Sequence, residues 1–414
     1  MHTLDAPADL QIDEIPARRR SLRVAYVTET YPPEVNGVAT TTAKFVEGLH
    51  RRQHDVQLVR PRQTRADEAG AGPRLHEVLM RGLPIPNYPH LRMGVPSKRA
   101  LVKLWSLRRP DVVHVATEGP LGWSALQAAT HLRVPVTSDF RTNFHAYSRH
   151  YGIGWLHRPI MAYLRKFHNR CACTMVPTET LKRELERAGF ERLQVVQRGV
   201  DTDRYGPTRR SDELRRGWGA GPDDVVVGIV GRLAAEKNLG LVVDAFREIR
   251  RTVAAARLVF IGDGPLRADL QAGCADAVFT GNRSGLDLAA HYASLDLFLF
   301  PSLTETFGNV TVEALASGLP VVAYDHAAAG QLIRSGTNGL LCTPGDTAGF
   351  IEAAIELAER APLRAAIAAQ ARATALGLGW DAVVARFEQH LADATAQALP
   401  ARPLYALRRT RPAA

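Results

Sequence analysis

The sequence predicts an α/β protein with two Rossmann-like domains, each built on its own parallel, doubly wound sheet. Short apolar runs alternate with longer amphipathic segments along the chain, which is typical of repeated βαβ units. The runs are nearly continuous in Val, Ile and Leu, which indicates strands buried on both faces of a parallel sheet. At 414 residues the chain is also too long for one compact core.

The first half opens with an apolar run at 23–29 that predicts a strand, and the segment 37–51 predicts the helix that follows it. Similar runs bounded by Pro, Gly or Asp predict further strands at 55–61, 111–116, 134–140 and 173–178. A stretch rich in Gly, Pro and charged residues at 199–224 then separates the two halves of the chain.

The second half repeats the pattern of buried strands and intervening helices. Strands are predicted at 225–231, 257–264, 277–281, 295–302 and 320–324. A last amphipathic helix begins at Trp380. The expected segments are a flexible tail at 1–20, a first domain at 21–200, a linker at 201–222, a second domain at 223–379, a helix at 380–399 and a basic tail at 400–414.

The composition excludes several classes of protein. The hydrophobic fraction of 46% and the charged fraction of 23% are ordinary for a globular protein, which excludes disorder and coiled coil for most of the chain. No apolar run is long enough for a membrane span, and the first 20 residues lack the apolar core of a secretory signal. The four cysteines form no CxxC pair, which favours a reduced, cytoplasmic protein.

The net charge of +10 points to an anionic partner, which could be nucleic acid, a membrane surface or a small molecule. Arginines are scattered through the predicted helices, many of them beside acids, so a nucleic-acid partner is not expected. The segments 98–109 and 156–170 combine basic, apolar and aromatic residues, as membrane-surface helices do. Their apolar faces could equally well cover the first sheet.

The segment 298–320 carries the most chemistry. A buried strand ends at Pro301, the following loop carries Glu305, and a helix begins near Asn309. Unpaired amides at the start of that helix form a natural diphosphate site, contributed by Phe307, Gly308, Asn309 and Val310. Glu305 and Glu313 flank this site, and they are interpreted either as acceptors for sugar and ribose hydroxyls or as a helix cap and a surface residue.

Two further segments of the second half follow predicted strands. Arg232 and Lys237 come after the first strand and could clamp a pyrophosphate from two sides, or could lie in a solvated loop. Gly262 and Gly264 form a tight turn after the next strand, where glycine lets the backbone approach a ligand closely.

In the first half, a single Gly37 before a helix replaces the GxGxxG of dinucleotide sites, which argues against NAD and permits a phosphate beside its amide. The loop at 138–152 follows a strand and is dense in polar and aromatic groups, among them Arg141 and His145. No His, Cys and Asp set has zinc spacing, so no zinc site is predicted, and the GxSxG motif of a serine nucleophile does not occur.

Over about 22–399 the chain resembles the retaining glycosyltransferases of family 4, which have the GT-B fold. The resemblance rests on the order and spacing of six segments: YPPEVNGVAT, the GVD of 199–201, GRLAAEKN, FIGDGP, VFTG and ETFGNVTVE. The chain looks most like the subgroup that contains GDP-mannose-dependent α-mannosyltransferases and related glycolipid-forming enzymes. This resemblance implies two domains facing across a cleft, the first for the acceptor and the second for the donor, with the last helix crossing back onto the first.

The resemblance also implies roles for the candidate residues. Glu305 would hold hydroxyls of the donor sugar and Glu313 the ribose, while Arg232 and Lys237 would neutralise the diphosphate. Gly37 and the amides of 307–310 would bind phosphate and sugar, and His145 or Arg141 would line the acceptor side. Relatives often read HTNF where this chain has RTNF at 141–144, so Arg141 stands at the position of a histidine.

The implied activity is retaining transfer of a hexosyl group, with mannose favoured, from a nucleotide-diphosphate sugar to a lipid or glycan acceptor. No metal ion or other cofactor is expected, and the enzyme is expected in the cytoplasm, in reversible contact with the inner face of an anionic membrane. The alternatives are a nucleotide-sugar epimerase or hydrolase on the same fold, a phosphorylase, which the lysine-poor second half disfavours, and a basic nucleic-acid-binding protein.

Overall fold

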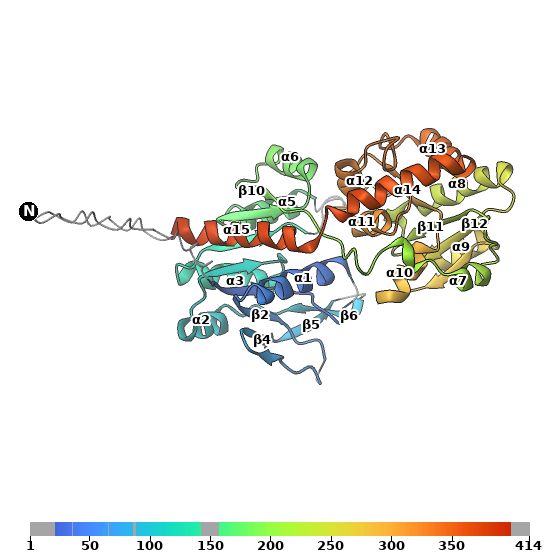
Figure 1. The fold of residues 1–414 in the computed structure, drawn as a ribbon. Coiled ribbons are helices and arrows are strands. Elements are labelled where there is room, and N and C mark those ends of the chain that lie inside the picture. The colour runs from blue at the N-terminus through green and yellow to red at the C-terminus, as the bar shows by residue number, and fades with distance from the viewer. Residues whose placement is uncertain (1–20, 35, 65, 86–87, 142–156, 399–414) are drawn as a thin grey trace, which may run out of the picture.

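The computed structural model describes residues 21–34, 36–64, 66–85, 88–141 and 157–398. Two α/β units lie next to each other, and the last helix runs back from the second unit onto the first (Figure 1). The predicted pair of parallel sheets is confirmed by the pairing of their strands. His145 lies outside the described residues.

The first domain contains an eight-stranded sheet in the order β10-β9-β8-β7-β1-β2-β4-β3, parallel except for the β3–β4 pair. Its strands are β1 (Arg23–Val27), β2 (Asp55–Pro61), β3 (Ala71–Gly72), β4 (Leu75–Met80), β7 (Val112–Val115), β8 (Val136–Asp139), β9 (Cys173–Val176) and β10 (Leu193–Val195). Its helices are α1 (Gly37–Arg51), α2 (Lys98–Leu107), α3 (Pro120–His131), α5 (His157–His168) and α6 (Glu179–Arg187). A separate antiparallel pair is formed by β5 (Gly82–Ile85) and β6 (Tyr88–Gly94).

The sequence-based prediction did not include β16 (Leu340–Cys342) of the second domain, β3, β4 and β10 of the eight-stranded sheet, or the separate pair β5 and β6. Prolines at positions 84, 86 and 89 interrupt the apolar pattern in this region. Proline lacks the backbone N–H that a strand residue donates to its neighbour. Edge strands and two-stranded pairs tolerate this loss because some of their N–H groups have no partner strand.

The second domain contains a six-stranded, fully parallel sheet in the order β13-β12-β11-β14-β15-β16. Its strands are β11 (Val226–Val230), β12 (Arg257–Ile261), β13 (Val278–Gly281), β14 (Leu297–Phe300), β15 (Val321–Tyr324) and β16 (Leu340–Cys342). Its helical segments are η2 (Pro207–Arg209), α7 (Asp212–Gly217), η3 (Ala235–Lys237), α8 (Leu239–Thr252), α9 (Arg267–Gly273), α10 (Gly285–Ala293), α11 (Asn309–Ala316), α12 (Ala327–Leu332), α13 (Thr347–Glu359) and α14 (Ala361–Leu376).

The last helix, α15 (Trp380–Ala398), packs onto the first domain although it follows the second in sequence (Figure 1). Its buried face shares a core with β1 and α1, in which the Phe387 ring centroid lies 4.3 Å from that of Phe45. Gly48 of α1 leaves room for this contact, because a Cβ there would come within 2.6 Å of Val384. Arg52 and Glu388 pair at 3.1 Å at the edge of the contact.

The strand orders decide where a ligand can bind. In the first sheet the chain runs outward from β1 in both directions, through β2 on one side and β7 on the other. The second sheet does the same from β11, through β12 and β14. In open parallel sheets the loops at such a switch point splay apart and leave a crevice at the carboxyl ends of the strands.

None of the helices in the described part of the chain is long and apolar enough to cross a membrane.

Candidate active site

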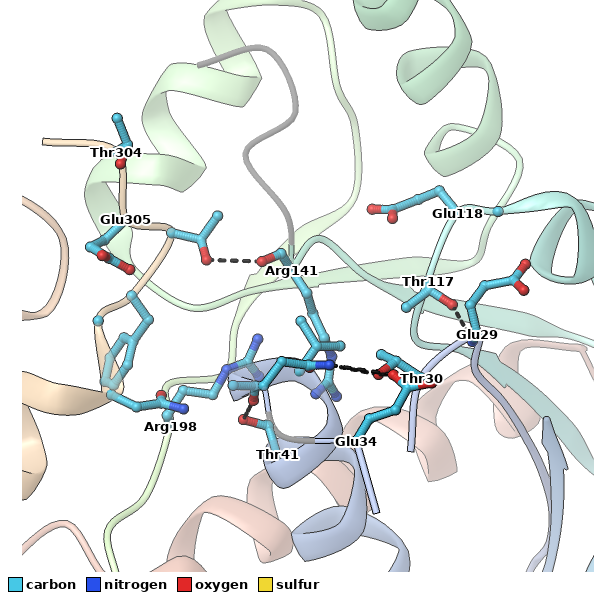
Figure 2. Close-up of a pocket in the computed structure, with 18 of the residues that line it drawn as sticks. Glu29, Thr30, Glu34, Thr41, Thr117, Glu118, Arg141, Arg198, Thr304 and Glu305 are labelled. Atoms are coloured by element: carbon cyan, nitrogen blue, oxygen red, sulfur yellow. Dashed lines mark hydrogen bonds between the residues drawn. The ribbon is translucent and has the colours of Figure 1, made fainter. Parts of the chain in front are cut away.

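A cavity of about 840 Å³ lies between the two domains, at the switch points of both sheets. The loops after β1 and β7 line it from the first domain, and the loops after β11 and β14 line it from the second. In Figure 2, Thr304 and Glu305 lie on one side and Glu29, Thr117 and Glu118 on the other, with Arg141 and Arg198 between them.

The N-termini of α1 and α11 converge on this cavity. A Cβ on Gly37, the first residue of α1, would lie 3.4 Å from the Asn309 side-chain nitrogen at the start of α11. No side chain caps α11, whose N-cap Gly308 has φ +89°, so the amides of its first turn have no side-chain acceptor at the cap. Two helix N-termini that face one space favour an anion there, since both present N–H groups and positive dipole ends.

Lys237 and Glu305 form an ion pair on the second-domain wall of the cavity. Lys237 comes from the end of η3 and Glu305 from the loop between β14 and α11. Their side chains are 14% and 16% exposed, and Ser302 lies 3.3 Å from the carboxylate. The structure therefore brings together two residues that the sequence places in separate motifs.

Arg232 and the two turn glycines lie beside this wall and are not among the cavity-lining residues that the structure describes. Arg232 is paired with Glu236. A Cβ on Gly262 would meet the carbonyl oxygen of Gly231 at 2.0 Å, and one on Gly264 would meet that of Leu233 at 2.5 Å. These glycines thus allow the loops after β11 and β12 to pack backbone against backbone, which sets the position of Arg232.

Glu313 lies in the second turn of α11, half-buried behind the cavity wall. The hydroxyl of Tyr292 donates a hydrogen bond to its carboxylate at 2.9 Å. Burial raises the pKa of Glu313 to about 7, although the Tyr292 hydrogen bond opposes this rise.

We expect Glu313→Gln to become more stable relative to the wild type as the pH rises. The folded protein holds a proton on Glu313 up to about pH 7, whereas a glutamate in the unfolded chain has a pKa of 4.5. The contribution of Glu313 to stability is therefore full below pH 4.5 and is lost as the pH rises through 7. Urea unfolding from pH 5 to 8 should show a relative gain of about 2 kcal/mol for the variant. The exposed Glu359→Gln is the control, and equal gains in both would contradict the assignment.

Arg141 lines the cavity, but its guanidinium is turned into the floor of the first domain. It pairs with Asp139, and it donates to the hydroxyl of Tyr26 at 2.9 Å. Burial would raise the pKa of Asp139, but the Arg141 charge outweighs it and holds that pKa well below the usual range. The Arg141 carbonyl accepts a hydrogen bond from Thr306 at 2.9 Å, which links the two domains.

Five charged cavity residues are absent from the predicted site: Glu29, Glu34, Arg92, Glu118 and Arg198. Glu29 accepts hydrogen bonds from the amides of Gly94 and Leu121, and burial raises its pKa to about 7. Glu118 pairs with His168. Glu29 ends one predicted strand, Glu118 comes two residues after another, and Arg198 directly precedes the GVD segment; these positions are the sequence signal that could have identified them.

No group of His, Cys, Asp and Glu within the described ranges is arranged to hold a metal ion.

Comparison with known proteins gives two family matches. Residues 35–204 match "Glycosyltransferase Family 4", and residues 224–360 match "Glycosyl transferases group 1". A GDP-mannose-dependent alpha-mannosyltransferase of Mycobacterium tuberculosis is 38% identical over 367 residues, which cover 87% of this chain and 94% of that protein. One of the same name from Corynebacterium glutamicum is 33% identical, covering 91% and 90%.

More distant similarities extend this picture. An alpha-monoglucosyldiacylglycerol synthase of Acholeplasma laidlawii is 26% identical and covers 77% of this chain and 84% of that protein. Among solved structures, Anabaena HepE in complex with UDP has a TM-score of 0.72 at 18% identity, covering 90% of this chain and all of that one. WaaG, a glycosyltransferase involved in lipopolysaccharide biosynthesis, has a TM-score of 0.67 at 17% identity, covering 89% and 99%.

Proposed function

The chain belongs to glycosyltransferase family 4, and from that premise we propose that it is a retaining enzyme that transfers mannose from GDP-mannose to a lipid or glycan acceptor. One observation carries the proposal: the N-termini of α1 and α11 meet at a cavity whose wall holds the Lys237–Glu305 pair. A cation, a carboxylate and two sets of amides are the groups that a sugar diphosphate requires.

The donor occupies the second-domain side of the cavity. Its diphosphate lies between Gly37 and the first turn of α11, and Lys237 and Arg232 neutralise its charge. Glu305 accepts hydrogen bonds from hydroxyls of the sugar, and Glu313 accepts them from the ribose. Lys237, Arg232 and the helix amides, rather than a metal ion, are proposed to stabilise the negative charge that grows on the departing diphosphate.

Transfer breaks the bond between the anomeric carbon and the diphosphate oxygen, and forms a bond from that carbon to an acceptor oxygen. The acceptor approaches on the face that the diphosphate leaves, so the anomeric configuration is retained. Its hydroxyl proton passes to a phosphate oxygen of the leaving group. The Thr306–Arg141 hydrogen bond ties the two domains together beside this point and helps to exclude water.

Arg141 acts as a positioning residue in this proposal. Its side chain is engaged by Asp139 and Tyr26, so it shapes the floor of the acceptor side. His145 is proposed to line the acceptor side as well.

Mannose and GDP are favoured because two relatives that cover most of this chain are named GDP-mannose-dependent alpha-mannosyltransferases. A thermal-shift panel of GDP-, UDP- and ADP-sugars tests the donor, with the largest shift expected for GDP-mannose. Turnover with lipid and soluble acceptors then tests transfer, and the product anomer is read by NMR. Release of free mannose or of an epimer without any acceptor would contradict the proposal and favour a hydrolase or an epimerase.

We also propose that the first domain docks reversibly on an anionic membrane, where a lipid acceptor would be reached. Helices α2 and α5 present exposed basic residues, and the apolar side chain of Leu107 at the end of α2 is 83% exposed. The exposed basic residues of the two helices are Lys98, Arg99, Lys103, Arg158, Arg165 and Lys166. Basic side chains would be attracted to the anionic lipid headgroups, and an exposed apolar side chain could insert among them.

Co-sedimentation with vesicles of phosphatidylglycerol and phosphatidylcholine tests this docking. We expect binding at low salt that weakens at high salt, and a loss of about tenfold in the double variant Lys98→Glu, Lys103→Glu. Arg250→Glu with Arg251→Glu, on α8 of the second domain, reverses the same number of charges and should bind as the wild type does. Equal losses in the two double variants would show that net charge alone drives binding.

A further inference from the structure

Arg198 is a buried cation at the boundary of the two domains. It lies three residues after the end of β10, and the residue is 6% exposed. Its side chain lines the cavity, and Figure 2 shows it between Glu305 on the second-domain side and Arg141 on the first-domain floor. The activity proposed above has so far given it no role.

The described residues supply Arg198 with no hydrogen bond and no ion pair. The other cations that line the described cavity do have partners: Arg141 pairs with Asp139, Lys237 pairs with Glu305, and Arg92 donates to the Gly82 carbonyl. Among the cations in the described cavity lining, Arg198 is therefore the one to which no described protein group gives a hydrogen bond or an ion pair.

The surroundings of Arg198 make this charge costly. Burial and the neighbouring Arg141 charge together lower the pKa of Arg198 to about 10, although the Asp139 carboxylate opposes this shift. At neutral pH the guanidinium is still charged. A buried charge without a partner destabilises a fold, so such a group persists where a ligand of opposite charge completes it.

The position of the Arg198 guanidinium in the cavity indicates which part of the nucleotide sugar it would contact. Arg198 shares the cavity with Gly37 and the first turn of α11, where the diphosphate is proposed to bind. The nucleoside is proposed on the second-domain side, near Glu313, so the phosphate that bears the sugar extends toward the first domain. The planar fork of an arginine fits two phosphate oxygens at once.

Resting on the proposed function, we propose that Arg198 binds the sugar-bearing β-phosphate of the donor and holds it as the glycosidic bond breaks. It completes, from the first domain, the set of cations that Lys237 and Arg232 provide from the second. Because the guanidinium stands in the first domain and its ligand is anchored to the second, the contact also couples donor binding to closure of the cavity.

Calorimetric titration of the full chain with GDP and with GMP tests the assignment. Arg198→Met keeps the length of the side chain and removes its charge. We expect it to weaken GDP binding about ten- to hundredfold and to leave GMP binding within about twofold, since GMP lacks the β-phosphate. Arg198→Lys should recover part of the loss as a point charge without the fork. Arg92→Met, which removes another cavity cation, should bind GDP as the wild type does.

The melting temperature without nucleotide separates this role from a structural one. Loss of an unpaired buried charge should leave the Tm of Arg198→Met equal to or above that of the wild type. A lower Tm would overturn the proposal, because the guanidinium would then support the fold. Unchanged GDP affinity, or equal losses for GDP and GMP, would overturn it as well. A wild-type chain that binds none of GDP, UDP and ADP would overturn the proposed function itself, and this inference with it.

Discussion

Replacing Lys237 by methionine is expected to reduce sugar transfer about a thousandfold or more while the protein stays folded. The Lys237 ammonium is the cation on the second-domain wall of the cavity, beside the loop that leads into α11. The variant would lose the attraction between this ammonium and the leaving diphosphate, on which negative charge grows during transfer. Steady-state turnover with a saturating donor is the measurement, because the loss should fall mainly on kcat.

The Lys237→Met variant also leaves Glu305 without its partner, which could lower stability for a trivial reason. The double variant Lys237→Met, Glu305→Gln removes both charges, so it should regain the melting temperature and stay inactive. Lys182→Met replaces a lysine on α6, far along the chain from the cavity loops, and should keep full activity. An active Lys237→Met enzyme would refute the diphosphate assignment.

Replacing Phe387 by alanine is expected to cost about 3–5 kcal/mol of stability, chiefly in the first domain. Phe387 is fully buried, and its ring centroid lies 4.3 Å from that of Phe45 and 4.8 Å from that of His114. The variant would leave a cavity between α15 and the sheet that it covers. Urea unfolding followed by circular dichroism should show an earlier transition.

The neighbouring Arg386 is exposed on the same helix, so Arg386→Ala should change stability by less than about 0.5 kcal/mol. If Phe387→Ala behaved like Arg386→Ala, the packing of α15 on the first domain would not hold in solution. Limited proteolysis offers a second measurement, since a loosened α15 would expose its junction with α14 near Gly377.

Most strands of the two main sheets could be predicted because they are short apolar runs that must be covered on two faces, whereas the short strands β3, β10 and β16 were not predicted. The run Val226–Val230, for instance, is buried at every position. The same logic missed β4, whose residues are only half-buried, and the proline-interrupted pair of β5 and β6. A pattern that is neither fully apolar nor cleanly alternating does not specify a strand.

The chemistry of the candidate site was predictable in part. Local sequence signals were enough to identify Gly37 and the segment 305–310 as candidate anion-binding groups. A glycine at the start of a predicted helix, or a turn before it without a capping side chain, indicates backbone amides that have no partner. Glu29 and Arg198 carry no such signal. A carboxylate after a strand or an arginine before a glycine is common, and what distinguishes these two is burial against a cavity.

The sequence by itself thus determined two parallel α/β sheets, and it located the loops that bear candidate anion-binding groups. Hydrophobic periodicity shows which faces of a segment are buried, and it depends only on residues that are close together in the sequence. Which loops meet was decided by the tertiary structure. Lys237 meets Glu305, α1 points at α11, and Arg198 reaches the cavity without a partner among the described residues, because two switch points face each other and α15 packs onto the first domain. Contacts between residues distant in sequence depend on how whole domains dock, and no local pattern records that.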